Sequence, residues 1–303
     1  MNPIKAFYVL ILFAMTLGFV FDRDYNLAIG SFFAMFILLL MGIFMEAEGN
    51  GETEKTYNIH PITTPYNVYY GDELNFTQDT ITGCLSKHLP YYNCLGAGEK
   101  QEFLTRLNKF IRAKTFKIHD KQGFKEMPIL VSAAAIQLSF GMDNYMLPQF
   151  EFIHIYPDEF FRSRHSFDVL AGNVSGQSIN ISWKHFLDGF KLPDDGQNVG
   201  LHEMAHAYYY QNFVCRDNID DCFISGYPQF TTYADKAFEQ EQVPGNDLYS
   251  EYALKNSQEF WAESIEIFFE KPSYLNNVYP DLYASLKTVL RQDPLLNITS
   301  MPG

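Results

Sequence analysis

Residues 200–211 contain two histidines four positions apart, with a glutamate directly after the first. An α-helix repeats every 3.6 residues, so His202 and His206 would lie on one helix face, where both can bind a single zinc ion. Glu203 between them would reach the open coordination position and act as general base toward an attacking water. The alternative is a pair of histidines without a metal. The HExxH pattern favours a helix that carries a catalytic zinc site.

Two classes of zinc protease are excluded by the residues around this motif. A metzincin would place Gly and His three and six residues after His206, where this chain has Tyr209 and Asn212. An intramembrane protease would place the motif within an apolar span, but the last such span ends at Met45. A catalytic zinc ion still needs a third protein ligand from elsewhere in the chain.

A later amphipathic segment, residues 257–270, offers several candidates for that third ligand. Its glutamates, at spacings of four, three and four, share one face and are Glu259, Glu263, Glu266 and Glu270. Such a stripe is commonly a solvated helix face, and spacing alone does not choose among the four. A bound cation would relieve the repulsion between them, which favours the functional interpretation.

The order of the remaining elements predicts the α+β class. Residues 99–114 have the apolar spacing of an amphipathic helix, and residues 127–140 are typical of a mostly buried one. Residues 150–156 and 178–183 have the patterns of strands, and further helices are expected after residue 196. Helices and strands in this order do not form repeated βαβ units.

The motif set resembles the Mlc titration factor A (MtfA) family of zinc peptidases, and more distantly the catalytic domain of anthrax lethal factor. The likeness covers about residues 84–295. Its upstream matches are Leu89-Pro90-Tyr91-Tyr92, Phe103 and Phe110, residues 156–160, residues 169–172, Ser182-Trp183, and Asn198-Val199 before the HExxH motif. Its downstream matches are residues 259–262, Glu266, Phe268-Phe269, Pro272, Pro280, Leu282-Tyr283 and Asp293-Pro294. The resemblance implies a gluzincin-type, zincin-like metallopeptidase domain with a small sheet and an edge strand.

The resemblance also implies roles for single residues. The family's third zinc ligand corresponds to Glu259, so that one Zn²⁺ would bind to His202, His206 and Glu259. A tyrosine seven residues before that ligand corresponds to Tyr252, which would donate its hydroxyl to the oxyanion of the attacked amide. The implied activity is aminopeptidase-like or directed at short peptides.

The chain departs from the family at two places. The family commonly continues HExxH with Gln-Leu-Asp, where this chain has residues 207–209, Ala-Tyr-Tyr, so that substrate preference does not transfer. Glu263 stands where the family often has an apolar residue, one turn after the ligand. It would either accept a hydrogen bond from a ligand histidine or face solvent.

Residues 178–183 precede the metal helix, where zincins usually have an edge strand. We expect an extended peptide substrate to bind there by strand addition. Gly172 and Asn173 come just before this strand and are expected at the rim of the cleft.

The N-terminus has two apolar runs, residues 6–21 and 27–45, which predict a transmembrane helical hairpin in the lipid bilayer. A signal peptide is disfavoured, because no small-residue cleavage site precedes Asp22 and a second apolar run follows at once. With Lys5 inside, both termini and the catalytic domain would be cytoplasmic. The predicted parts are a hairpin over residues 1–47, a polar tether over 48–75 and a metallopeptidase domain over 76–303.

The net charge bears on possible partners, and the cysteine content bears on disulfide formation. The 22 Lys and Arg against 36 Asp and Glu give a net charge of -14, which argues against nucleic acid as a partner. The four cysteines are expected to be buried free thiols, and the alternative in an oxidising compartment is two local disulfides, Cys84–Cys94 and Cys215–Cys222.

The sequence thus predicts a membrane-anchored zinc metallopeptidase acting on a peptide or protein substrate. The competing hypothesis is a binding module of the MtfA type, which would sequester a transcriptional regulator at the membrane with little or no catalysis.

Overall fold

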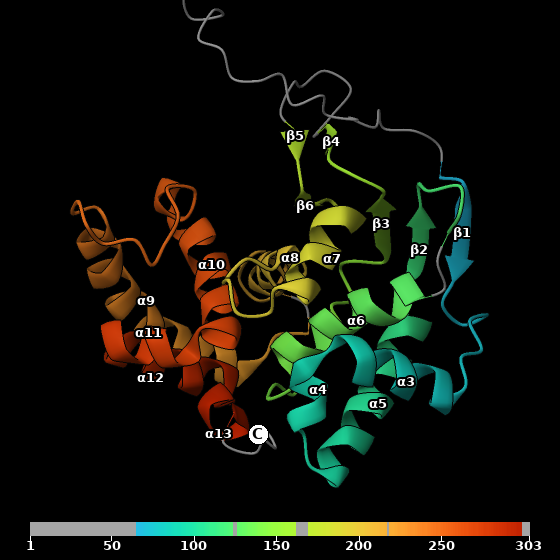
Figure 1. Cartoon of the computed structure of the whole chain (residues 1–303), viewed down its shortest axis with the longest axis horizontal. Helices are drawn as coiled ribbons and strands as arrows, with labels where there is room; N and C mark the ends of the chain where they lie inside the picture. The colour runs from blue at the N-terminus through green and yellow to red at the C-terminus, as the bar shows by residue number, and fades with distance from the viewer. Residues whose placement is uncertain (1–64, 124–125, 162–168, 217, 299–303) are drawn as a thin grey trace, which may run out of the picture. The chain divides into compact units, whose positions relative to one another are not determined.

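A computed structural model describes residues 65–123, 126–161, 169–216 and 218–298 (Figure 1). Its strands are β1 (Asn67–Tyr70), β2 (Thr115–Ile118), β3 (Phe152–Tyr156), β4 (Phe160–Phe161), β5 (Val169–Leu170), β6 (Gly172–Ser175) and β7 (Ser178–Ser182). Its helices are α3 (Gln78–His88), α4 (Pro90–Cys94), α5 (Ala97–Arg112), α6 (Glu126–Ser139), α7 (Trp183–Lys191), α8 (Val199–Tyr209), the π-helical turn η1 (Tyr210–Cys215), α9 (Asp221–Glu241), the 3-10 turn η2 (Ala253–Lys255), α10 (Ser257–Glu270), α11 (Pro272–Val278), α12 (Pro280–Leu290) and α13 (Pro294–Ile298). The predicted α+β class is confirmed.

Helices α5 and α6 form where the apolar spacing predicted them. In α5 the buried side chains recur every three or four residues and are Phe103, Leu104, Leu107, Phe110 and Ile111. In α6 every residue from Met127 to Ser139 is buried. Such a helix needs neighbours on all sides, and α6 packs against α3, α5 and α8. Helix α6 is therefore central to the core and packs directly against α8, the helix that contains the HExxH motif.

A mixed five-stranded sheet has the strand order β1-β2-β3-β7-β6. Strands β2, β3 and β7 are parallel, while β1 and β6 are antiparallel to their neighbours. The β6–β7 hairpin closes through a two-residue turn at Gly176, whose φ of 59° is a left-handed conformation that glycine adopts without steric cost.

The position of β7 corrects one expectation. Residues 178–183 were expected to form an edge strand, but β7 lies between β3 and β6 and is paired on both sides. In the described part of the chain the edge strand on this side is β6, which contains Gly172 and Asn173. Strand β6 was missed because Gly-Asn-Val-Ser lacks the alternation of apolar residues by which a strand is recognised.

The structure describes only the last part of the predicted N-terminal segments, from residue 65 onward. Strand β1 lies within residues 48–75, which were predicted as a tether, and it pairs with β2 from Asn67 to Tyr70. The folded part therefore begins before residue 76. The predicted transmembrane hairpin over residues 1–47 lies outside the described residues. Among the helices that the structure describes, none is long and apolar enough to cross a membrane.

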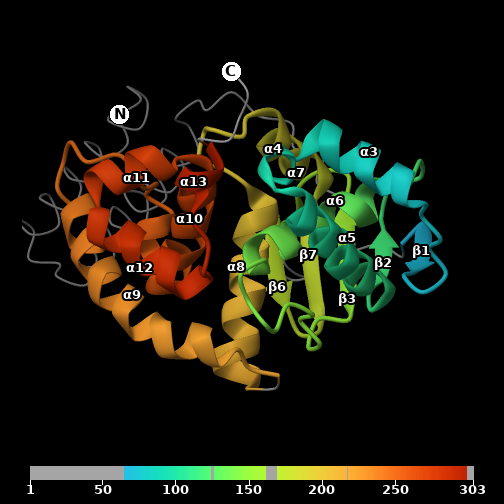
Figure 2. The same ribbon diagram turned by 90° about the horizontal axis from the view of Figure 1, so that it is seen from below.

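Helix α8 lies between the sheet and the C-terminal helices, as Figure 2 shows. It contacts β6 and β7 on one side and α10 on the other. Trp261 of α10 is fully buried, and its indole N–H donates to the carbonyl oxygen of Ala205 in α8 at 3.0 Å. Aromatic rings of α9 surround this indole, from Phe223, Tyr227 and Phe230. The four cysteines are free thiols, as expected, but none of them is fully buried and Cys222 is exposed.

Candidate metal centre

Helix α8 carries the HExxH motif and begins at a defined cap. The side chain of Asn198 accepts a hydrogen bond from the backbone N–H of Leu201 at 3.0 Å, which satisfies one of the free donors in the first helical turn. From this start, His202 and His206 fall one turn apart on the same face, as their spacing predicted.

Helix α10 carries the candidate third ligand in its first turn. Asn256 caps this helix, because its side-chain oxygen accepts from the backbone N–H groups of Gln258 and Glu259, each at 3.0 Å. The cap and the Trp261 hydrogen bond to α8 together fix where the Glu259 carboxylate lies.

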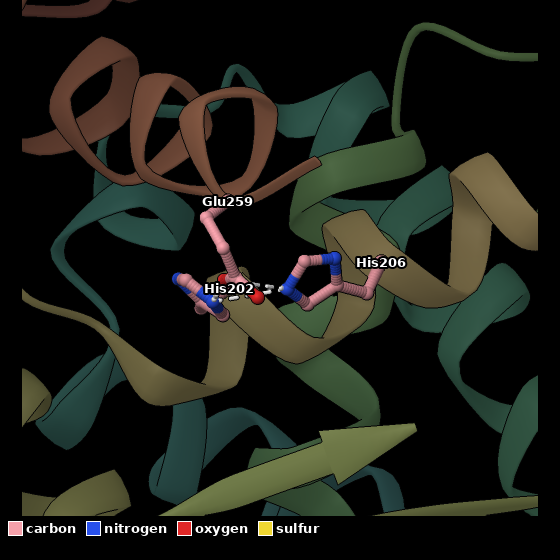
Figure 3. Close-up of side chains that lie close together, drawn as sticks. All are labelled: His202, His206 and Glu259. Atoms are coloured by element: carbon pink, nitrogen blue, oxygen red, sulfur yellow. Dashed lines mark hydrogen bonds and ion pairs between the residues drawn. The ribbon is translucent and has the colours of Figure 1, made fainter. Parts of the chain in front are cut away.

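The side chains of His202, His206 and Glu259 converge on one point (Figure 3). The Nε2 atoms of the two histidines lie 3.1 Å apart. Oxygen Oε2 of Glu259 lies 3.1 Å from Nε2 of His202 and 3.2 Å from Nε2 of His206. Three donor atoms from two helices thus form a nearly equilateral triangle.

This triangle has the size that a zinc ion requires. With bonds of about 2.0–2.1 Å, ligand atoms in a tetrahedral zinc site are about 3.3 Å apart. Two imidazoles and one carboxylate are also the donor set of the His₂Glu catalytic sites. The residues present therefore fit a zinc ion with an open fourth position.

The carboxylate of Glu266 contacts Nδ1 of His202, the ring nitrogen that does not face Glu259 and His206. Its Oε1 lies 2.6 Å from Nδ1 of His202, and because a carboxylate accepts, the histidine proton is on Nδ1. Nε2 of His202 is then free to bind a metal. Burial alone would lower the pKa of His202, but its hydrogen bonds with Glu259 and Glu266 raise it well above the usual value. The cluster therefore stabilises positive charge, which a divalent cation would supply.

Glu203 is only 5% exposed, and its side chain extends from α8 to the edge strand β6. Its Oε2 has no hydrogen-bond partner among the described residues. Burial raises the pKa of Glu203 to about 8. A Cβ atom on Gly172 would lie 2.5 Å from Oε1 of Glu203, so that only glycine lets strand and carboxylate come so close. Positive charge at the neighbouring ligand triangle, as a metal ion would supply, would lower this pKa and keep the carboxylate ionised, so that its free oxygen could accept a proton from a water.

These groups all border one cavity of about 400 Å³. His202, Glu203, His206 and Glu259 line it together with Tyr252 and all four residues of β6. The Tyr252 hydroxyl lies 3.5 Å from Oε1 of Glu259, and the tyrosine is 44% exposed. The expectation that Gly172 and Asn173 lie at the cleft is confirmed.

Each of the four glutamates of α10 has its own set of contacts, which spacing could not reveal. Glu259 contacts the two histidines, and Glu266 accepts from His202 and from the backbone N–H of Asn198. Glu270 accepts from the Asn198 side chain at 2.9 Å. Glu263 accepts from the backbone and the hydroxyl of Ser250, so it neither contacts a ligand histidine nor simply faces solvent. The role of Glu266 was missed, although its i+7 spacing from Glu259 placed it on the same face.

A second group of potential metal ligands, Asp158, Glu159 and His185, lies close together. The ammonium group of Lys184 already forms an ion pair with the Asp158 carboxylate, at 3.0 and 3.1 Å from its two oxygens. His185 Nε2 lies 3.0 Å from Glu159 Oε1. The side chains of this group are thus satisfied by one another and by lysine.

Comparison with known proteins agrees with the metal centre. The sequence profile of the glucose-regulated metallo-peptidase M90 family matches residues 73–291, more than half of the chain. Mlc titration factor A of Pectobacterium atrosepticum is 28% identical over an alignment of 199 positions that covers 58% of this chain and 71% of that protein. Mlc titration factor A of Edwardsiella ictaluri is 26% identical over an alignment of 227 positions that covers 68% of this chain and 85% of that protein. An uncharacterized protein of Synechocystis sp., slr2042, is 27% identical over an alignment of 240 positions that covers 70% of this chain and 84% of that protein.

The support of His202 by Glu266 gives a first prediction. Replacement Glu266→Gln removes the acceptor charge that orients the imidazole, and we expect zinc affinity to fall about 10- to 100-fold. Zinc titration calorimetry would measure this loss. Glu270→Gln, the same change one turn later, contacts no ligand histidine and should bind zinc nearly as wild type does. Equal affinities of wild type and Glu266→Gln would contradict the proposed support.

The contact between Gly172 and Glu203 gives a second prediction. Replacement Gly172→Ala places a methyl group against the buried carboxylate, and overpacking of this kind costs about 1–3 kcal/mol of unfolding free energy. Urea denaturation of the zinc-free protein would measure this cost. The control is Ser175→Ala at an exposed position of the same strand. A Gly172→Ala protein as stable as this control would show that the strand is free to move away.

Proposed function

The chain belongs to the glucose-regulated metallo-peptidase M90 family, and from this premise we propose that it is a zinc peptidase that hydrolyses peptide bonds. The same family contains proteins of the Mlc titration factor A type, whose motifs this sequence resembles. The observation that carries the proposal is the buried Glu203 carboxylate, whose free oxygen lines the same cavity as the three candidate ligands.

His202, His206 and Glu259 would hold the zinc ion. When bound, zinc supplies Lewis-acid chemistry, which lowers the pKa of a water and polarises a carbonyl group. The protein's own contribution is proton transfer by Glu203. As general base its carboxylate takes the proton of the attacking water, and as general acid it later delivers that proton to the leaving amine.

Tyr252 would stabilise the negative charge that develops on the attacked carbonyl oxygen. Its hydroxyl borders the metal cavity and lies 3.5 Å from Oε1 of the ligand Glu259, within reach of a substrate held at the metal. A hydroxyl held in this position donates a hydrogen bond to the oxyanion and favours the tetrahedral state over the planar amide.

The substrate would bind as an extended strand along β6. The four residues of this edge strand line the metal cavity, and an extended peptide can continue the sheet there through main-chain hydrogen bonds. This binding mode is the one expected from sequence, moved from β7 to β6. The family resemblance favours aminopeptidase-like activity on short peptides.

Glu203→Gln tests the mechanism. The amide cannot accept the proton of the attacking water, so we expect turnover to fall at least about 100-fold while zinc content stays at one ion per chain. Cleavage of a mixed peptide pool by the zinc-loaded protein, followed by mass spectrometry, would measure the rate and reveal the preferred bond. A Glu203→Gln protein that cleaves as fast as wild type would remove Glu203 from the reaction.

The same variant separates the peptidase from the alternative function. The names of the Mlc titration factor A relatives favour a regulatory protein as a partner, in which case binding would matter and cleavage would not. If the protein acts as an enzyme, cells that carry Glu203→Gln should behave like a deletion strain. If it acts by sequestering a regulator, they should behave like wild type.

We also propose that residues 6–45 anchor the chain in the bilayer with the catalytic domain in the cytoplasm. The proposal rests on the two uncharged apolar runs and on Lys5 before them. The full chain should stay with membranes after alkaline carbonate extraction, and protease added outside intact cells should leave residues 65–298 uncut. Release by carbonate would overturn the anchor, and cleavage from outside would reverse the orientation.

A further inference from the structure

The segment that carries Tyr252 follows α9 and leads into α10. Tyr252 itself is 44% exposed, so that burial does little to fix its ring. The ammonium group of Lys255 lies over the ring at 4.1 Å from its centroid. A cation–π contact at such a surface position is worth only about 0.5–1 kcal/mol. The backbone on either side of Tyr252 therefore contributes to the position of the hydroxyl, together with its 3.5 Å contact to Oε1 of Glu259.

Glu263 holds that backbone two residues before Tyr252. Its Oε1 accepts from the backbone N–H of Ser250 at 2.6 Å, and its Oε2 accepts from the Ser250 hydroxyl at 2.5 Å. The Ser250 oxygen in turn accepts from the backbone N–H of Ala253 at 3.2 Å. The Glu263 carboxylate thus holds Ser250, and the Ser250 hydroxyl in turn holds the backbone of Ala253, so that the two hydrogen-bonded residues of this turn flank Tyr252.

The preceding residue, Tyr249, strengthens the attachment to the same helix. Its ring stacks on Phe260 with the centroids 4.2 Å apart, and its hydroxyl lies 2.9 Å from the hydroxyl of Ser264. Its backbone N–H donates to the buried carboxylate of Glu241 at 3.2 Å. Residues 249 and 250 are therefore both attached to α10, within one and a half turns of the metal ligand Glu259.

We propose that Glu263 is a positioning residue that sets the distance of the Tyr252 hydroxyl from the metal centre. The inference rests on the proposed function, in which Tyr252 donates to the oxyanion. Glu259 and Glu263 lie one turn apart on α10, so a rigid helix carries both the ligand and the group that holds the turn. Helix α10 would then fix the distance between the metal ligand Glu259 and the Tyr252 hydroxyl, although Tyr252 itself lies on a loop.

A direct role of Glu263 at the metal does not account for its contacts. The Nδ1 atom of His202 is already paired with Glu266. Both oxygens of Glu263 are directed at Ser250 instead. Its effect on the reaction would therefore pass through the turn and Tyr252.

A double-mutant cycle tests this chain of contacts in the zinc-loaded full-length protein. Glu263→Ala removes both acceptors and keeps a good helix former. We expect kcat to fall about tenfold with KM within about twofold of wild type, because a misplaced donor weakens stabilisation of the transition state and leaves substrate binding intact. In a Tyr252→Phe protein, which already lacks the donor, Glu263→Ala should cause no further loss of kcat.

Two further variants separate hydrogen bonding from charge. Glu263→Gln keeps one acceptor oxygen for Ser250 and should lose less activity than Glu263→Ala. Glu251→Ala removes an equal charge from the same turn, at an exposed residue, and should leave kcat unchanged. The proposal would be overturned if Glu263→Gln and Glu263→Ala lowered kcat equally. It would also be overturned if Glu263→Ala lowered kcat by the same factor in the wild-type and the Tyr252→Phe background.

Hydrogen exchange gives a readout that does not depend on activity. The backbone N–H groups of Ser250 and Ala253 both donate into the Glu263 turn, so Glu263→Ala should make both exchange at least about tenfold faster. Unchanged exchange would overturn the proposal even if the enzyme is active. If wild type cleaves no peptide, the proposed function and the catalytic role of the turn fall together, while faster exchange would still establish that Glu263 holds the turn.

Discussion

The hydrogen bonds of Glu266 connect the two helices on which the metal centre depends. One oxygen accepts from Nδ1 of His202, and the other accepts from the backbone N–H of Asn198, the residue that caps α8. A single buried carboxylate thus sets the tautomer of one candidate ligand and fixes the start of the helix that carries both histidines. Because Glu266 lies on α10 with Glu259, the ligand triangle is determined by the packing of two helices.

The stripe of four glutamates on α10 would be destabilising if the helix were isolated, because neighbouring carboxylates repel. In the folded chain each of them has a polar partner: His202 and His206 for Glu259, Ser250 for Glu263, His202 again for Glu266, and the Asn198 side chain for Glu270. The repulsion is offset only when α8 and the segment after α9 are both in place. The stripe therefore couples the formation of the site to the tertiary fold.

The local part of this arrangement could be predicted from sequence, and the long-range part could not. The spacing of His202 and His206 follows from the helix repeat, and α5 and α6 follow from apolar periodicity. Family resemblance, and not spacing, singled out Glu259 among four equivalent glutamates. Strand β6 has no apolar alternation and was missed, because its place at the edge depends on pairing with β7. The partner of Glu263 is a serine thirteen residues earlier, in a segment without periodic signal.

In the proposed mechanism, the close approach of β6 to α8 connects substrate binding with the general base. Gly172 allows the edge strand to lie against Glu203, and this contact both buries the carboxylate and brings the strand to the metal cavity. A peptide that paired with β6 as proposed would be recognised through its main chain, which every sequence shares. Side chains would then be selected only where they leave the strand, toward surfaces such as Tyr209 and Tyr210 at the cavity wall. These tyrosines lie at and just after the point where the sequence departs from the family after HExxH, so substrate preference should differ there while the chemistry is retained.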